Sequence, residues 1–264
     1  MTNIGLTSDL VAALPGGGRM PLLGFGTWQL RDDEARSAVH TALETGYRHI
    51  DTATGYRNES QVGAALRESG VPRDQIFVTT KMPPDHVGRE RQTLEESLEK
   101  LGTPYVDLWL IHWPPAGTAG VDSWQVFIEA QKQGLARAIG VSNYSVAQVD
   151  ELIEATGQAP AANQIKWSPF QFDRGVLDAM RERGVVLEGY SPFRAARLDD
   201  PALVGIAGAH GKSAAQVIIR WHVQHGIVVI PKSARRERIE SNVDVLDFEL
   251  TSAEMATIDG LSES

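Results

Sequence analysis

The chain has 264 residues, with 25 lysines and arginines against 34 aspartates and glutamates, a formal net charge of −9 and no cysteine. The absence of cysteine excludes disulfides, thiolate nucleophiles and cysteine-ligated metal centres. No basic N-terminal region precedes an apolar core, and no apolar run approaches the roughly 20 residues of a membrane helix. We therefore expect a cytoplasmic protein without a membrane partner, and the acidic balance disfavours nucleic acid as a partner.

Short runs of aliphatic and β-branched residues alternate with segments of helical spacing, which is the pattern of repeated βα units. The turn of an N-terminal hairpin is predicted at Pro15-Gly16-Gly17-Gly18. The predicted strands lie near 22–24, 47–50, 76–80, 106–111, 138–141, 162–164, 185–188 and 227–229. The predicted helices cover 32–45, 59–69, 88–101, 121–132, 145–155, 174–182, 213–224 and 235–243.

Strands and helices that alternate in this number fit a closed (β/α)8 TIM barrel, a fold of about 250 residues. We therefore expect residues 1–264 to form one domain. The alternative is an open doubly wound sheet, which normally has a glycine fingerprint after its first strand. The segment Gly24-Phe25-Gly26-Thr27-Trp28-Gln29 lacks the third glycine of GxGxxG, which favours the barrel.

Four polar side chains follow three successive predicted strands. Asp51 and Tyr56 follow the second strand, Lys81 follows the third, and His112 follows the fourth. Because the active site of such a barrel forms at the carboxyl ends of its strands, we expect the four side chains to face one pocket.

These residue types in one pocket point to reduction of a carbonyl group. A free tyrosine has a pKa of about 10, and a lysine ammonium beside the phenol lowers it. Asp51 would hold Lys81 in place and charged, while His112 would donate a ring N–H to the carbonyl oxygen and Tyr56 would donate the proton. Since no side chain supplies hydride, the site implies a nicotinamide cofactor.

Each residue taken singly is also typical of a structural role, and it is their joint placement that favours catalysis. A metal-dependent barrel hydrolase is the competing class of enzyme. It needs several converging histidine and carboxylate ligands. The first strand has no His-x-His, and His112 has no ligand partner nearby in the sequence.

A set of segments resembles the aldo-keto reductases, in the family's order, from about residue 20 to 260. They are Leu23-Gly24-Phe25-Gly26-Thr27-Trp28, Gly46-Tyr47-Arg48-His49-Ile50-Asp51-Thr52-Ala53, Tyr56-Arg57-Asn58-Glu59, Thr80-Lys81, Asp107-Leu108-Trp109-Leu110-Ile111-His112-Trp113-Pro114, Ile139-Gly140-Val141-Ser142-Asn143-Tyr144, Asn163-Gln164 and Ile230-Pro231-Lys232-Ser233. The chain is most similar to short bacterial members, among them the 2,5-diketo-gluconate reductases. The resemblance implies an NADPH-dependent barrel reductase whose catalytic tetrad is Asp51, Tyr56, Lys81 and His112.

The resemblance also implies which residues bind the nicotinamide. Ser142, Asn143 and Gln164 would hydrogen-bond the carboxamide, which has both a donor and an acceptor. The ring of Tyr190 would stack on the nicotinamide, and Ser191 follows it in the cofactor site.

A second implied group binds the adenosine end of the cofactor. Lys232, Ser233 and Arg238 would bind the 2′-phosphate, and Asn242 would contact the adenine. Arginine suits phosphate because its planar fork makes bidentate, charge-assisted bonds. The basic cluster of Lys232, Arg235, Arg236 and Arg238 in an acidic protein favours NADPH over NADH.

The chain departs from the family pattern at three places. Ser241 replaces the usual Glu before Asn242, and Lys166 and Ser168 replace common residues after Gln164. Phe193-Arg194 replaces Leu-Gly in the loop that normally covers the cofactor pyrophosphate. We therefore hypothesise that Arg194 or Arg197 bonds the pyrophosphate and slows NADPH release.

Trp28 and Trp113 would line the substrate pocket above Tyr56 and His112. The chain ends soon after Leu261, which leaves no long C-terminal loop, so we expect an open pocket for small aldehydes, α-keto carbonyls and sugar-derived ketones. The resemblance suggests a monomer. The alternative function is an NADPH-binding barrel with a sensing or structural role and little turnover, against which the intact tetrad argues.

Overall fold

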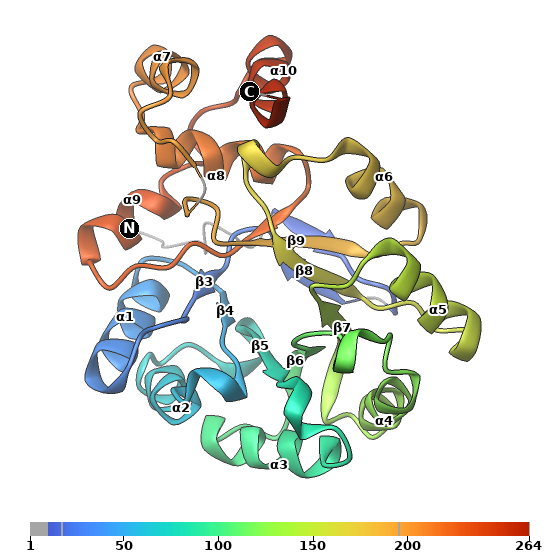
Figure 1. Cartoon of the computed structure of the whole chain (residues 1–264). Helices are drawn as coiled ribbons and strands as arrows, with labels where there is room; N and C mark the ends of the chain where they lie inside the picture. The colour runs from blue at the N-terminus through green and yellow to red at the C-terminus, as the bar shows by residue number, and fades with distance from the viewer. Residues whose placement is uncertain (1–9, 17, 195, 264) are drawn as a thin grey trace.

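A closed ring of parallel strands forms the centre of the molecule in the computed structural model, which describes residues 10–16, 18–194 and 196–263 (Figure 1). Each strand pairs in parallel with the next one along the chain. Leu23 and Val229 join the two ends of the sheet by a parallel bridge. The (β/α)8 barrel is thereby confirmed, with strands β3 Phe25–Gly26, β4 His49–Asp51, β5 Phe77–Met82, β6 Val106–Ile111, β7 Ala136–Ser142, β8 Ala162–Lys166, β9 Val186–Tyr190 and β10 Val228–Val229.

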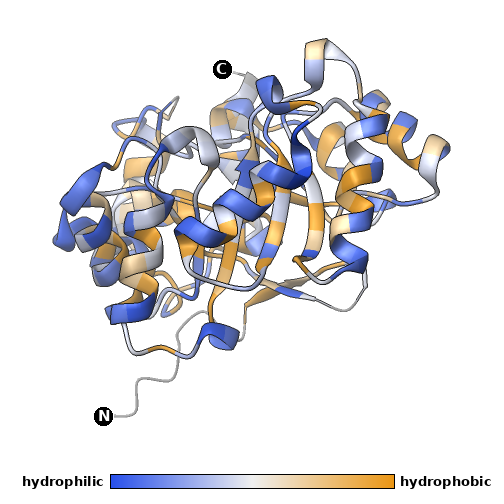
Figure 2. Ribbon diagram, turned by 90° about the horizontal axis from the view of Figure 1, so that it is seen from below, coloured by the Kyte–Doolittle hydropathy of each residue, from blue (hydrophilic) through white to orange (hydrophobic). Residues whose placement is uncertain are grey.

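Helices surround the ring, and those that correspond to predicted helices have an apolar stripe at helical spacing. Helix α1, for example, buries Ala35, Ala38, Val39 and Ala42 against the barrel. Figure 2 shows hydrophobic residues along the strands and hydrophilic ones over much of the outer helical surface. The helices that correspond to predicted ones are α1 Asp32–Glu44, α2 Glu59–Glu68, α3 Glu90–Leu101, α4 Val121–Lys132, α5 Val146–Thr156, α6 Arg174–Glu182, α8 Ala214–Gln224 and α9 Arg236–Val243.

Two further helices were not predicted, α7 Pro201–His210 and α10 Ser252–Asp259. Both lie outside the ring, beyond α8 (Figure 1). Helix α7 is apolar without a clear polar face, so the search for one buried stripe misses it. Helix α10 begins with a capping box between Thr251 and Glu254, a signal that the sequence does contain.

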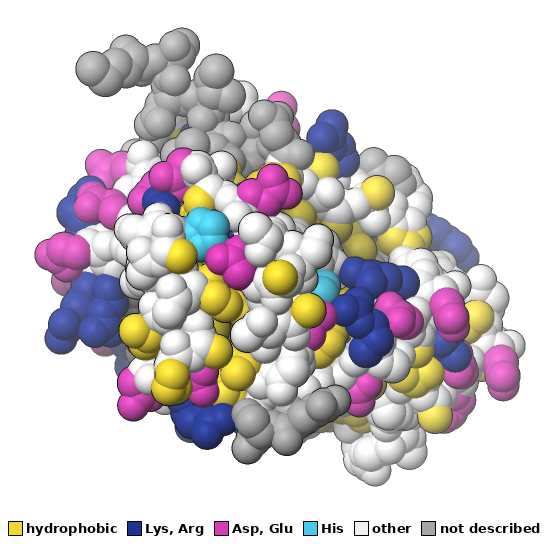
Figure 3. All heavy atoms as spheres, turned by 90° about the horizontal axis from the view of Figure 1, so that it is seen from above, with side chains coloured by type: hydrophobic (Ala, Val, Ile, Leu, Met, Phe, Trp, Pro, Cys, Tyr) yellow, Lys and Arg dark blue, Asp and Glu magenta, His cyan; other side chains and the backbone are white. Residues whose placement is uncertain are grey.

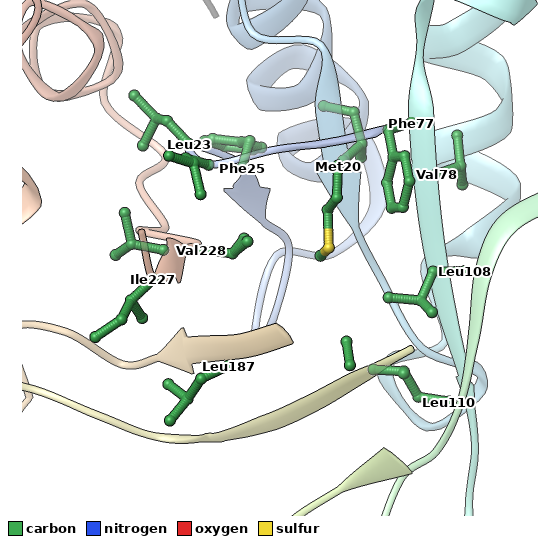
Figure 4. Packing of buried hydrophobic residues seen from close by; sticks show 14 of the residues in the cluster. Met20, Leu23, Phe25, Phe77, Val78, Leu108, Leu110, Leu187, Ile227 and Val228 are labelled. Carbon is green, nitrogen blue, oxygen red and sulfur yellow. The ribbon is translucent and has the colours of Figure 1, made fainter. Parts of the chain in front are cut away.

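The predicted N-terminal hairpin is confirmed: β1 Val11–Ala13 pairs with β2 Arg19–Pro21 in antiparallel register. Gly17 of the predicted turn lies outside the described residues. Met20 is fully buried, and Figure 4 shows it among side chains of the barrel strands such as Phe77 and Leu108. Because the hairpin packs where these strands begin, the opposite end of the barrel is left for a site.

Several strand boundaries differ from the prediction, and two of the differences affect the site. Asp51 is the last residue of β4, and Lys81 lies inside β5 with Leu110 as its β6 partner, so neither residue follows its strand as predicted. The strands continue because their backbone groups still find partners on the neighbouring strand. As a result the Lys81 side chain lies within the barrel and is fully buried.

The surface carries both signs of charge. Figure 3 shows acidic and basic side chains beside one another on one face of the molecule. Among the described residues, no single helix is long and apolar enough to cross a membrane. Helices α7 and α8 reach the required length and apolar composition only when they are counted together, and the pair is sharply bent.

Candidate active site

A cavity of about 580 Å³ opens at the carboxyl ends of the strands. Most of the residues predicted for the site line it together. They are Trp28, Asp51, Tyr56, His112, Trp113, Ser142, Asn143, Gln164, Tyr190, Ser191 and Lys232. The two tryptophans, Trp28 and Trp113, are 40% and 49% exposed at the mouth of the cavity.

Lys81 and Asp51 form a buried ion pair at the floor of this cavity. The Lys81 Nζ lies 2.6 Å from Asp51 Oδ1 and donates a second hydrogen bond to the Thr52 carbonyl oxygen at 2.9 Å. It also lies 3.4 Å from the Tyr56 hydroxyl. The Tyr56 ring meets the His112 ring edge to face, with centroids 5.7 Å apart. The four tetrad residues are therefore brought together as predicted.

A short 3-10 turn, η1 Thr54–Tyr56, carries Tyr56 back over the end of β4. The buried Asn58 holds this turn, because its Nδ2 donates to the carbonyl oxygens of Thr27 and Leu30. The Thr52 hydroxyl donates to Asn58 Oδ1 at 2.7 Å. Asn58 thus ties the loop after β3 to the loop after β4 and fixes the position of the phenol.

Burial and the ion pair act against each other on the pKa values of the tetrad. Burial raises the pKa of Tyr56, and the nearby Lys81 ammonium lowers it by less. The sequence-based prediction of a lowered Tyr56 pKa was wrong, because it included only the charge of Lys81. In the structure, the desolvation of the phenolate raises the pKa by more than this charge lowers it. Burial disfavours the ammonium form of Lys81, but Asp51 and Tyr56 outweigh burial, so the pKa of Lys81 is raised.

His112 is neutral at physiological pH. Burial, reinforced by the positive charge of Lys81, lowers the pKa of His112 to about 3. A neutral imidazole has one N–H to donate and one lone pair to accept with. The ring can therefore hydrogen-bond a carbonyl oxygen in the cavity without giving up a proton.

A hydrogen-bonded wall stands beside the tetrad, formed by β7, β8 and β9. The Asn143 Nδ2 donates to the His112 carbonyl oxygen, and the Tyr190 hydroxyl donates to Asn143 Oδ1 at 2.9 Å. The Ser142 hydroxyl donates to the backbone oxygen of Gln164. The Gln164 side chain donates a hydrogen bond from Nε2 to Asp51 Oδ2 at 2.8 Å. Its side-chain oxygen, Oε1, is left as an acceptor for a ligand. This wall suits the amide N–H of a nicotinamide carboxamide.

Three non-glycine residues of the cavity wall have left-handed backbone conformations: Gln29, Asn143 and Ser191, with φ of 64°, 64° and 54°. Such conformations cost free energy and concentrate at functional sites. Gln29 was not predicted as a site residue, although it directly follows Trp28. Gln29 lines the cavity in the structure, and the sequence reveals neither this placement nor its backbone conformation.

Other lining residues were also missed: Gly26, Gly55, Pro192 and Ile230. Gly26 allows β3 to lie close to the backbone that follows β10, because a Cβ there would lie 2.9 Å from the Ile230 carbonyl oxygen. Gly26 and Ile230 belong to two of the motif segments, so the motifs could have indicated that these residues lie at the site.

The residues predicted for the adenosine end of the cofactor lie just before and within α9, and one arginine of the predicted basic cluster has other partners. Arg235, Arg238 and Asn242 are spaced three and four residues apart and so share one face of the helix. The buried Ser233 hydroxyl accepts the Arg235 N–H at 3.0 Å. Arg236 instead forms ion pairs with Glu44 at 2.7 Å and Glu240 at 3.2 Å, which removes it from the predicted basic cluster.

The residues that depart from the family pattern lie in different surroundings. The Arg194 guanidinium lies 5.2 Å from the centre of the Trp28 ring and lines the cavity, as does Phe193. Arg197 lies 4.7 Å from the Phe170 ring. Lys166 is exposed at the end of β8, and Ser168 is buried, but neither lines the cavity.

Residues 22–263 match the Aldo/keto reductase family. An aldo-keto reductase of Mycolicibacterium vanbaalenii is 47% identical over 249 residues, covering 92% of this chain and 89% of that protein. A morphine 6-dehydrogenase of Pseudomonas putida is 45% identical over 265 residues, covering 94% and 90%. The chain therefore belongs to the aldo-keto reductase family.

Solved structures agree with this assignment. An aldo/keto reductase of Brucella melitensis superposes with a TM-score of 0.91 at 43% identity, covering 95% of this chain and 98% of that chain. An aldo-keto reductase of Bombyx mori in complex with NADP superposes with a TM-score of 0.88 at 35% identity, covering 95% and 92%.

Proposed function

We propose that this protein is an NADPH-dependent reductase of aldehydes and ketones, with Tyr56 as the general acid and residues 1–264 as one domain. The observation that carries the proposal is the buried Lys81–Asp51 pair beneath Tyr56, next to a neutral His112. Family membership and the NADP complex of the Bombyx mori relative support it. Bound NADPH supplies the hydride that no side chain can supply.

Each tetrad residue has a defined task in this proposal. The His112 imidazole hydrogen-bonds the substrate oxygen and orients the carbonyl. The Tyr56 hydroxyl donates its proton to that oxygen, and Lys81 stabilises the phenolate that remains, because it is the nearby cation. Asp51 keeps Lys81 charged and in place through their 2.6 Å contact. Trp28 and Trp113 form the apolar walls for the substrate.

The residues that would hold the cofactor fit its two ends. Gln164 and Tyr190 both line the cavity, where a nicotinamide would lie. The basic residues at the start of α9 suit the 2′-phosphate of the adenosine end. Lys232 belongs to that basic segment and also lines the cavity, which connects the two ends.

The proposed activity is tested by following NADPH absorbance with a panel of aldehydes, α-keto carbonyls and keto sugars. Consumption of NADPH with at least one carbonyl substrate is expected. Tight NADPH binding without turnover across the whole panel would instead favour a sensing or structural role. The panel also ranks the substrate classes.

Replacing Arg238 by alanine is expected to weaken NADPH binding by roughly 10- to 100-fold, since a hydrogen bond to a charged group contributes about 1.5–3 kcal/mol. NADH lacks the 2′-phosphate, so the affinity of Arg238→Ala for NADH should equal that of the wild type. Equilibrium titrations of both cofactors measure this. Arg236→Ala is the matched control, because Arg236 is held by Glu44 and Glu240 and should leave NADPH affinity intact. Unchanged NADPH affinity in Arg238→Ala would contradict the assignment.

Removing both loop arginines, with Arg194→Ala and Arg197→Ala, is expected to speed the release of NADPH several-fold. The hypothesis is that their guanidinium groups bond the pyrophosphate, and Arg194 already lines the cavity. Stopped-flow displacement of bound NADPH measures the release rate. A release rate equal to that of the wild type would show that these side chains do not hold the cofactor.

A further inference from the structure

Glu188 is a carboxylic acid in the interior of the barrel that the proposed mechanism does not use. It lies on β9, opposite Gln164 of β8 and Val228 of β10, and its side chain is fully buried. Neither of its carboxyl oxygens makes a hydrogen bond of ordinary geometry with a described residue, although the Gln164 side chain still favours its ionised form. A buried carboxylate in such a place is costly, so the state of this group needs an explanation.

The groups that face Glu188 come from four other elements. His49 and Asp51 belong to β4, Lys81 to β5, Gln164 to β8 and Tyr56 to η1. The His49 Nε2 lies 3.8 Å from Glu188 Oε1, beyond hydrogen-bond distance, and contacts the Thr79 hydroxyl at 3.1 Å instead. Burial lowers the pKa of His49 to about 3, so His49 is neutral and does not balance a charge on Glu188.

The number of charges in the barrel interior leaves one carboxyl group without a cation. Lys81 is the only lysine or arginine among the buried residues of the described chain, whereas Asp51 and Glu188 are both buried and both interact electrostatically with Lys81. Burial raises the pKa of Asp51 as well, but Asp51 has the Lys81 ammonium on one oxygen and the Gln164 amide on the other, so we assign the negative charge to Asp51. A neutral interior then requires that Glu188 keep its proton.

The electrostatic environment of Glu188 agrees with this count. Burial, followed by the negative charge of Asp51, raises the pKa of Glu188 to about 8, although Gln164 and Lys81 oppose the rise. In the other direction, a charge on Glu188 raises the pKa values of Tyr56 and Lys81. The protonation state of Glu188 therefore acts on the group that donates the proton.

We propose that Glu188 is a positioning residue for the catalytic ion pair: it stays protonated, which reserves Lys81 for Asp51 and Tyr56, and its ionisation makes Tyr56 a weaker acid. The role in catalysis rests on the proposed reductase function. The protonation of Glu188 does not rest on it, because it follows from the buried charges alone. The two parts are therefore tested separately.

The first test compares the pH dependence of thermal unfolding between the wild type and Glu188→Gln, without cofactor. A carboxyl whose folded pKa is raised binds more protons in the folded state, so it lowers stability as the pH rises from its unfolded pKa to its folded pKa. The amide that replaces the carboxyl group in this variant cannot titrate. The unfolding temperature of Glu188→Gln relative to the wild type is therefore expected to increase by roughly 5 °C between pH 5 and pH 8.5.

Two further variants make this result interpretable. Glu182→Gln makes the same chemical change at an exposed position on α6 and should show no such trend. Glu188→Leu also removes the titrating group, so it gives the same pH trend if the glutamine variant does not fold. A difference that stays constant with pH would overturn the proposal. A difference that falls with rising pH would also overturn it, because it would mean that Glu188 is ionised and paired in the folded protein.

The second test measures the hydride-transfer rate of NADPH-dependent reduction against pH. At pH 6.5 the wild type and Glu188→Gln should agree within about twofold, because Glu188 is neutral in the wild type. At pH 9 the wild type should fall about threefold or more below the variant, since a nearby negative charge weakens the acid. Tyr56 stays protonated at that pH, because burial raises its pKa above the ordinary value.

The outcomes separate a positioning role from a structural one and from failure of the proposed function. Parallel pH profiles for the two proteins, with a lower rate in the variant at every pH, would show a structural role only and would overturn the positioning role. Absence of NADPH-dependent reduction in the wild type would reject the proposed function. The unfolding experiment would then still decide whether Glu188 is protonated.

Discussion

Replacing Tyr56 by phenylalanine is expected to lower the rate of NADPH-dependent reduction by about 10²- to 10⁴-fold, the usual contribution of a positioned general acid. The change removes one oxygen atom, the one that lies 3.4 Å from Lys81 Nζ. The phenyl ring keeps its edge-to-face contact with His112, so the shape of the cavity is preserved. Steady-state rates at neutral pH with a substrate from the panel measure the loss.

Cofactor binding is the control for this variant. The adenosine end would be held at the start of α9, and Gln164 and Tyr190 would hold the nicotinamide. None of these residues changes in Tyr56→Phe, so the dissociation constant for NADPH should stay within about twofold of the wild-type value. If Tyr56→Phe retains the wild-type turnover, Tyr56 is not the acid and the proton must come from another group in the cavity, with His112 the next to test.

Replacing Lys81 by methionine is expected to abolish most of the activity and to destabilise the fold. Lys81 is fully buried, and its ammonium group is bound to Asp51 Oδ1 and the Thr52 carbonyl oxygen. Its removal leaves the Asp51 carboxylate buried without a cation, which typically costs about 3–5 kcal/mol. It also removes the cation that stabilises the Tyr56 phenolate, so the rate should fall by about 10²-fold or more. Chemical denaturation and steady-state kinetics measure the two effects.

The double variant Lys81→Met with Asp51→Asn separates these two effects. It removes both charges, so much of the lost stability should return, while the activity should remain low because the phenolate still lacks a cation. The stability deficit of the single variant should also grow as the pH rises, because Asp51 protonates in acid and then leaves no unpaired charge. Recovery of activity in the double variant would show that Lys81 acts only through the fold.

Much of the candidate site could be predicted because its residues lie at fixed places on local elements. The hydrophobic run of β6 leads directly to His112, and the family motif at the end of β7 contains Ser142 and Asn143. The alternation of strand and helix signals predicts the barrel, since the period of the apolar residues is a local property of the chain. Helix α7 escaped prediction for the same reason, because it lacks such a period.

Other features depend on contacts between residues far apart in the chain. Arg236 belongs to the predicted basic cluster by sequence, but it hydrogen-bonds Glu44, which lies 192 positions away in the chain. The closure of the barrel depends on Leu23 and Val229 in the same way.

The sequence by itself determined the fold class and the family and predicted the candidate tetrad, because strand-end residues and motif spacing are local features. Only the tertiary structure decided the ionisation of these groups. Burial raises the pKa of Tyr56 by more than the charge of Lys81 lowers it, and burial also keeps His112 neutral. The buried Glu188 carboxyl group has no hydrogen bond of ordinary geometry with a described residue. The physical reason is that the pKa of a group depends on its burial and on the charges near it. Both are fixed only when the barrel closes and brings the strands around the group.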